Sequence, residues 1–306
     1  MNAGFSSSIR VVTRVRPLLG VKPEDACWKV DSHSCQISAV PLAKPRSSGH
    51  FQLEPQLGPR VPEIFTFDRV YSGDTRTSQI YTQDCSDIVS SVLEGYNGTI
   101  FLYGQTKSGN FSYDSGKTFT MQGSPNSSSA NYSEMGVLQL SLQQIFETIK
   151  TFAKNKIAKI YISYFEIYNE VLIDLLNPKG DPSELRITDD EQVGALYQQY
   201  GITIVGLRQQ KVRKLSEALH LLKFGEEYRK YRVTDYNTHS SRSHAIFKVF
   251  VETRELIGGT PNSSRLLDDS DLDNSNLWPS SLSTFSCLVR LLMTLRTWWI
   301  WLDRSG

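Results

Sequence analysis

The stretch Gly95–Gly123 reads GYNGTIFLYGQTKSGNFSYDSGKTFTMQG, and the rest of the fold follows from it. Its apolar run, Thr99 to Tyr103, lies between turn residues, which predicts a strand buried on both faces. A glycine-rich turn and then Gly116-Lys117-Thr118 follow this run. Backbone N–H groups of such a loop bind phosphate oxygens, a lysine adds positive charge, and a threonine hydroxyl can hold Mg²⁺. The stretch therefore predicts a phosphate site directly after a buried strand.

The phosphate-binding motif is interrupted. The spacing GxxxxGK[ST] fails, because Phe111 stands five positions before Gly116. However, Gly104 opens the run GQTKSG, and removing Asn110–Gly116 joins that run to Lys117 as GQTKSGKT, an unbroken P-loop. We interpret the motif as intact but split by seven residues. The alternative is a glycine-rich surface loop that contains Gly-Lys-Thr by chance.

A second polar motif, NTHSSRSH, occupies residues 237–244. A short helix is predicted before it at Ser216–Phe224, with Gly225 at its end, and a strand after it at Ala245–Thr253. Phosphoryl transfer needs positioning and charge stabilisation more than covalent help. Serine hydroxyls can bind Mg²⁺ or orient water, and an arginine can pair with a carboxylate. The alternative for this motif is a polar surface turn.

Together these stretches resemble the kinesin motor domain family. GYNGTIFLYGQT and SGKTFTM are similar to the family's P-loop, NxxSSRSH to its switch I, and YFEIYNE with DLL, from Tyr164, to a further segment. CWKVD at Cys27 and the opening RVRPL look most like mitotic, centromere-associated kinesins. The resemblance implies an α/β fold: a P-loop NTPase-like central mixed sheet with helices on both faces. It also implies an ATPase that moves along microtubules.

The resemblance gives each matching residue an expected role. Ser240 and Ser241 would contact the γ-phosphate, Mg²⁺ or the attacking water, and Arg242 would pair with a glutamate of switch II. Asn237 would brace the loop. Thr118 and Ser241 are the expected Mg²⁺ ligands. The residues expected to bind ATP are Arg14, Arg16, Pro17, Gly104, Gln105, Thr106, Ser108, Gly109, Ser115, Gly116, Lys117, Thr118 and Phe119.

Apolar periodicity predicts the other elements of the chain. The predicted elements are strands at 9–17, 65–70 and 157–169 and helices at 77–94 and 138–149. Residues 38–64 and 177–208 are rich in turn residues and predict loops. Because the resemblance places a microtubule contact in the second of these loops, Lys179 and Arg186 are candidates for it, although several acidic residues surround them.

Composition narrows the class of protein. The net charge is +1, from 33 basic and 32 acidic residues, which argues against a nucleic-acid partner bound by bulk charge. The four cysteines lack zinc spacing, and Met1–Ser8 lacks the apolar core of a signal peptide. The apolar run 282–302 contains two arginines, which are costly in lipid. We expect a cytoplasmic chain on the microtubule cytoskeleton or the spindle, with tubulin as partner and no membrane.

The resemblance ends near Glu252, and no DxxGSE strand follows. We therefore expect a partial motor domain at 1–256, truncated before switch II, and a divergent tail at 257–306 that is disordered or non-native. The sheet would then lack its last strands. Asp303-Arg304-Ser305-Gly306 fits DxxG, and we take that match as chance.

Three functions are open at this point. The first is a microtubule motor domain that binds and hydrolyses ATP. The second is a non-hydrolysing fragment that binds nucleotide or tubulin weakly, as the split P-loop and the missing DxxGSE suggest. The third is another P-loop NTPase such as a small GTPase, which the lack of an Asn-Lys-x-Asp motif disfavours. Subfamily, direction, cargo and oligomeric state depend on neck, stalk and tail sequences.

Overall fold

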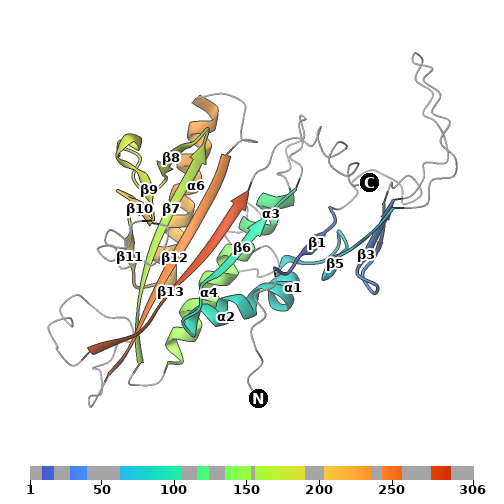
Figure 1. The fold of residues 1–306 in the computed structure, drawn as a ribbon, viewed down its shortest axis with the longest axis horizontal. Coiled ribbons are helices and arrows are strands. Elements are labelled where there is room, and N and C mark those ends of the chain that lie inside the picture. Colours follow the sequence, from blue (N-terminus) through green and yellow to red (C-terminus); the bar gives the residue numbers. More distant parts are fainter. Residues whose placement is uncertain are drawn as a thin grey trace. The chain divides into compact units, whose positions relative to one another are not determined.

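The computed structural model describes residues 9–16, 28–39, 63–104, 116–123, 135–152, 156–189, 203–235, 243–256 and 277–290. The chain divides into two compact units, Met1–Ile80 and Tyr81–Gly306. Figure 1 shows the elements of both units coloured along the sequence. No helix in the described ranges is both long and apolar enough to cross a membrane.

The first unit contains two small sheets and one helical turn. Its elements are β1 (Val12–Arg14), β2 (Trp28–Asp31), β3 (Gln36–Ala39), β4 (Ile64–Thr66), β5 (Arg69–Tyr71) and α1 (Thr77–Ile80). Strand β1 pairs in parallel with β5, and β2, β3 and β4 form an antiparallel sheet in that order. The strand predicted at 9–17 is present but shorter.

The single strand predicted at 65–70 is wrong, because Phe67 and Asp68 separate β4 from β5. Both residues bond to other segments of this unit. The Phe67 N–H donates to the carbonyl of Cys35 at 3.0 Å, and the Asp68 carboxylate accepts from the Val11 N–H at 2.6 Å. The alternating pattern of 65–70 gives no sign of these partners, which lie far away in the sequence.

The second unit is built on a mixed sheet. Its strands are β6 (Gly98–Leu102), β7 (Lys156–Tyr168), β8 (Val171–Asp174), β11 (Gln210–Val212), β12 (Ser243–Leu256) and β13 (Leu277–Arg290). The order is β11-β7-β12-β13-β6, with β8 also paired to β7. Only β13 and β6 run parallel, and the other pairs are antiparallel, so the predicted mixed sheet is confirmed. A separate hairpin joins β9 (Arg186–Thr188) to β10 (Thr203–Val205).

Helices cover one face of this sheet. They are α2 (Ser86–Leu93), α3 (Gly116–Gln122), α4 (Val137–Lys150) and α6 (Leu215–Asp235). Alternate residues of β7 and β12, such as Ile160, Ile162, Val249 and Val251, join the core beneath these helices. The predicted stripe of α4 is buried, and each such side chain contributes roughly 1.5–3 kcal/mol. The opposite face carries a smaller core of strand and loop residues around Phe165.

Strand β6 departs from the prediction of burial on both faces. Ile100 is buried among the helices, but Phe101 is 49% exposed. Within the second unit β6 pairs only with β13, so it forms an edge of the described sheet. The apolar run from Thr99 to Tyr103 therefore has one buried face and one exposed face, whereas the sequence predicted that both faces are buried.

Strand β13 lies within residues 257–306, the stretch expected to be a disordered or non-native tail. It lies between β12 and β6 and pairs with both. The sequence does not predict this strand, because it is rich in serine and includes Pro279, which has no N–H to donate. The structure accommodates this proline opposite Arg254, where the register of the pair shifts between Thr253 and Arg254.

Helix α6 continues well past the predicted end at Gly225. It runs to Asp235, so Gly225 lies in its interior rather than at its C-terminus. A Cβ atom at this position would lie 2.3 Å from Cδ1 of Tyr164. The glycine therefore serves close packing of the helix on β7.

Replacing Gly225 by alanine is expected to lower the free energy of unfolding by about 1–3 kcal/mol, the usual cost of overpacking a core. The gain in helix propensity, about 1 kcal/mol, offsets part of the clash. Urea denaturation measures the change. Gly116→Ala is the matched control, because a Cβ there meets no atom within 4 Å. Equal stability of the Gly225→Ala and wild-type chains would mean that α6 moves away without cost.

Helix 77–94 was predicted as one continuous element, and it contains a π-helical turn at η2 (Tyr81–Cys85). The side chain of Gln144 from α4 lies beside this turn. Its Nε2 donates to the Ser86 carbonyl and to the Ser90 hydroxyl, both at 2.9 Å, and its Oε1 accepts from the Tyr81 hydroxyl. A neighbouring helix thus stabilises the π-helical turn. The local apolar pattern could not predict this turn, because the stabilising contact comes from another helix.

Candidate functional site

The two described ends of the split motif are in direct contact. Gly104 follows the end of β6, and Lys117 lies in the first turn of α3. The Lys117 Nζ donates a hydrogen bond to the carbonyl oxygen of Gly104. The two halves that the sequence assigns to one P-loop therefore meet beside the edge strand, and residues 105–115 between them lie outside the described residues.

The first turn of α3 has two adjacent buried side chains followed by an exposed one. Lys117 and Thr118 are only 7% and 6% exposed, whereas Phe119 is 40% exposed. Burial lowers the pKa of Lys117, because the interior disfavours its charged form. A buried ammonium needs acceptors, and it finds one in the Gly104 carbonyl. A phosphate oxygen would be a stronger acceptor at the same place.

The described residues include one of the two expected Mg²⁺ ligands, Thr118. They contain no group of three or more His, Cys, Asp or Glu side chains arranged to hold a metal ion. The Thr118 hydroxyl is the hard oxygen donor that Mg²⁺ prefers, and Mg²⁺ commonly takes its remaining ligands from phosphates and water.

Arg14 belongs to the first unit, where it joins β1 to the start of α1. Its guanidinium donates to the Thr75 carbonyl at 2.8 Å and to the Thr77 hydroxyl at 3.0 Å. Burial lowers the pKa of this arginine. Arg16 is exposed at the end of the same segment, and Pro17 lies outside the described residues.

The expected catalytic residues also lie outside the described residues. They are Asn237, Ser240, Ser241 and Arg242. Some of the expected ATP ligands also lie outside the described residues, namely Gln105, Thr106, Ser108, Gly109 and Ser115. The structure does place both ends of the second motif. Helix α6 ends at Asp235, and β12 begins at Ser243, which is 2% exposed and pairs with Tyr168 of β7.

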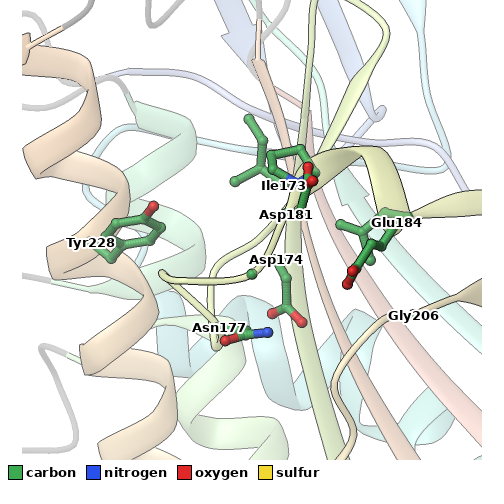
Figure 2. Close-up of a pocket in the computed structure, with 10 residues that line it drawn as sticks. Ile173, Asp174, Asn177, Asp181, Glu184, Gly206 and Tyr228 are labelled. Atoms are coloured by element: carbon green, nitrogen blue, oxygen red, sulfur yellow. The ribbon is translucent and has the colours of Figure 1, made fainter.

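A separate cavity of about 80 Å³ lies beside the end of β8. Figure 2 shows carboxylates of Asp174, Asp181 and Glu184 around it, with Tyr228 of α6 nearby. Its acidic lining disfavours phosphate. Sequence reasoning did not predict this cavity, because its walls come from segments far apart in the chain.

The Asp174 carboxylate is already engaged in holding the walls of this cavity. It accepts hydrogen bonds from the backbone N–H groups of Leu176 and Arg208, each at 2.8 Å. Burial raises the pKa of Asp174, and these donors partly oppose that shift. Asp174, which begins the DLL motif, therefore links β8 by hydrogen bonds to the segment that leads to β11.

A family model described as the kinesin motor domain matches residues 14–272. This chain belongs to the kinesin motor domain family. The match begins at Arg14, the last residue of β1, and includes both halves of the P-loop and the NTHSSRSH motif, which are segments that carry the resemblance.

Relatives and a solved structure agree with the family. The Arabidopsis thaliana kinesin-like protein KIN-7O is 34% identical over 247 residues, which are 81% of this chain and 16% of that protein. Human centromere-associated protein E is 36% identical over 191 residues, 62% of this chain and 6% of that protein. A solved structure of a fast kinesin matches with a TM-score of 0.67 at 25% identity, covering 94% of this chain and 67% of its own.

These comparisons confirm the predicted family, and centromere-associated protein E is one of the relatives within it. The chain spans about a sixth of the length of KIN-7O.

Proposed function

We propose that this chain is the nucleotide-binding part of a kinesin that binds ATP with Mg²⁺, hydrolyses it and moves along microtubules. The observation that carries the proposal is the contact between Lys117 and Gly104, which joins the halves of the split P-loop. Membership of the kinesin motor domain family supports the same function. The solved kinesin that matches is described in terms of its ATPase mechanism and its interactions with microtubules.

The proposed roles follow the sequence motifs. The phosphates bind between 104–109 and the first turn of α3, where Lys117 supplies charge. Thr118 and Ser241 bind the Mg²⁺ that accompanies ATP, whose charge would stabilise the transferring phosphoryl group. Ser240 contacts the γ-phosphate or the attacking water, and Arg242 and Asn237 act in the switch. The adenine lies against Arg14, Arg16 and Pro17.

Tubulin is the proposed partner, and the microtubule cytoskeleton, including the spindle, is the proposed location. The named relatives are kinesin-like proteins, and one is associated with centromeres by name. Exposed basic residues for a tubulin contact include Lys179 and Arg186, near the hairpin of β9 and β10. Such residues would attract acidic groups of a partner surface over a Debye length of about 8 Å.

Isothermal titration with ATP and GTP, each with and without Mg²⁺, tests the nucleotide. We expect a preference for ATP that depends on Mg²⁺, and a preference for GTP would overturn the proposal. Co-sedimentation with microtubules tests the partner, and ATP turnover with and without microtubules separates a motor from a fragment that only binds. Binding without turnover would support the non-hydrolysing alternative.

A further inference from the structure

Tyr164 contacts both segments that flank the NTHSSRSH motif at 237–244. On β12, which begins inside the motif, Phe247 lies directly opposite Tyr164 in the strand register. The two rings meet edge to face, with centroids 5.3 Å apart and planes at 74°. On α6, which ends just before the motif, the Glu226 carboxylate accepts a hydrogen bond from the Tyr164 hydroxyl.

The contact between Tyr164 and α6 is close and buried. The glycine at 225 lets the helix approach the ring, since a Cβ there would lie 2.3 Å from Cδ1. Tyr164, Glu226 and Arg229 are 1%, 8% and 7% exposed. The second oxygen of Glu226 accepts from Arg229, at 2.9 Å from Nη2 and 3.3 Å from Nε. Each carboxylate oxygen of Glu226 therefore has a donor, one from the sheet and one from the helix.

Stability alone does not account for this arrangement. A buried ion pair contributes little net stability compared with apolar residues of similar size, because both charges lose their hydration. A directional bond from a hydroxyl to a carboxylate, however, fixes the rotation and the height of a helix in a way that apolar packing does not. Here it fixes α6 relative to β7, and the Phe247 contact fixes β12 relative to the same side chain.

We propose that Tyr164 is a positioning residue for the switch segment, acting through its hydroxyl and Glu226. One side chain sets the distance between the end of α6 at Asp235 and the start of β12 at Ser243, which are the two anchors of that segment. The inference rests on the proposed function, because the segment matters for catalysis only if its serines meet the γ-phosphate. Catalytic groups must be held to within about 0.5 Å of their productive positions.

Tyr164→Phe tests the proposal, with Tyr228→Phe as its matched control. Both variants lose one tyrosine hydroxyl, and the hydroxyl of Tyr228, which lies on α6 like Glu226, donates to the Pro178 carbonyl at 3.3 Å. The first readout is hydrogen exchange without nucleotide in peptides covering 231–245. We expect exchange there to speed up at least about threefold in Tyr164→Phe and to stay unchanged in Tyr228→Phe, with the centre of β7 unchanged in both.

The second readout is the ratio of affinities for a non-hydrolysable ATP analogue and for ADP, both with Mg²⁺. A loss of general stability weakens both ligands alike, whereas a misplaced switch segment weakens only the ligand that has a γ-phosphate. We expect the ratio to fall at least about fivefold in Tyr164→Phe and to stay constant in the control, within the usual range of coupling between sites.

A double-mutant cycle with Glu226→Met tests whether the hydroxyl acts through Glu226. Methionine has a similar length but no carboxylate oxygen to accept the hydroxyl, so the effect of Tyr164→Phe on exchange and on the affinity ratio should largely vanish once Glu226 is methionine. Full additivity of the two changes would overturn the role given to this bond.

The outcomes separate the positioning role from the proposed function. A chain that binds neither nucleotide contradicts the proposed function, and exchange at 231–245 then decides the positioning role alone. Unchanged exchange in Tyr164→Phe, or an equal change in Tyr228→Phe, would overturn the inference even if ATP binds normally.

Discussion

Lys117→Met is expected to weaken the binding of ATP with Mg²⁺ by about 10- to 100-fold. A hydrogen bond from an ammonium to a charged acceptor contributes about 1.5–3 kcal/mol, and each 1.4 kcal/mol corresponds to a factor of about ten in affinity. Methionine keeps most of the length and volume of the lysine side chain but has no charge. Isothermal titration of both chains under the same conditions measures the change.

The same substitution should leave the fold intact. Lys117 is 7% exposed, and burial lowers its pKa, so the folded chain pays for removing a charge from water. Methionine removes that cost and gives up the bond to the Gly104 carbonyl, so we expect the free energy of unfolding to change by no more than about 1 kcal/mol. Weaker nucleotide binding with an unchanged free energy of unfolding would show that Lys117 serves ligand binding rather than stability.

The stability of the chain at alkaline pH should depend on Lys117. Its folded pKa lies below the ordinary 10.5, so between the two values the unfolded chain binds more protons than the folded chain. The contribution of Lys117 to the free energy of unfolding is therefore lowest below this window and rises as the pH increases through it. Lys117→Met should remove the part of the rise in the free energy of unfolding that comes from Lys117. The part that comes from Lys248 should remain, because burial also lowers the pKa of that lysine.

Lys223→Met is the matched control for both measurements. Lys223 lies on the surface of α6, where its side chain is 76% exposed and 3.9 Å from Glu227. Such surface pairs contribute at most about 1 kcal/mol, so the control should bind ATP like the wild type. Equal losses of affinity in both variants would mean that net charge, rather than a bond at the P-loop, attracts the nucleotide.

Elements with a long and regular apolar pattern were predictable from the sequence. The strand predicted at 157–169 is β7 at 156–168, and the helix predicted at 138–149 is α4 at 137–150. One face of α4 is buried along the helix, and β7 is buried on both faces over most of its length, so in each element the apolar pattern repeats often enough to be recognised locally. Gly95, the predicted stop of the helix before β6, has a φ of 108° just past the end of α2, a conformation that favours glycine.

The errors share a physical cause, which is that contacts between distant segments overrode a local signal. Gly225 looks like a helix end but is required where α6 meets the ring of Tyr164. Pro279 looks like a strand breaker but lies at a shift in the register with β12. No local rule could predict either outcome, because the deciding partner lies elsewhere in the chain.

The candidate site was predictable only in part. The motif spacing indicated that Gly104 and Lys117 belong together, and the structure places them in hydrogen-bond contact. The partners of Tyr164 were not predictable, because Glu226 and Arg229 look like ordinary surface charges of a helix. Their burial appears only when β7 and β12 lie beneath α6. The ligand roles of the P-loop and switch residues stay predictions.

Deleting Asn110–Gly116 is expected to tighten the binding of ATP with Mg²⁺ at least about tenfold. A P-loop works because successive N–H groups lie on one short arc around the phosphates. Seven added residues cost roughly 1 kcal/mol or less in closure entropy, so the larger effect is geometric. The deletion leaves GQTKSGKT and lets Gly109 precede Lys117 directly. Titration of ATP with Mg²⁺ into both chains measures the gain.

Two variants separate the geometry of the loop from its charge. Asp114 lies three positions before Lys117 and brings a carboxylate into the same loop, so Asp114→Asn in the full-length chain tests charge alone. We expect it to tighten binding no more than about threefold, consistent with one screened surface interaction. Adding Lys117→Met to the deleted chain should cancel the gain, because the rebuilt arc still needs its lysine. Equal affinities before and after the deletion would mean that the seven residues extend away from the phosphates, and that the contact between Gly104 and Lys117 already forms a working site.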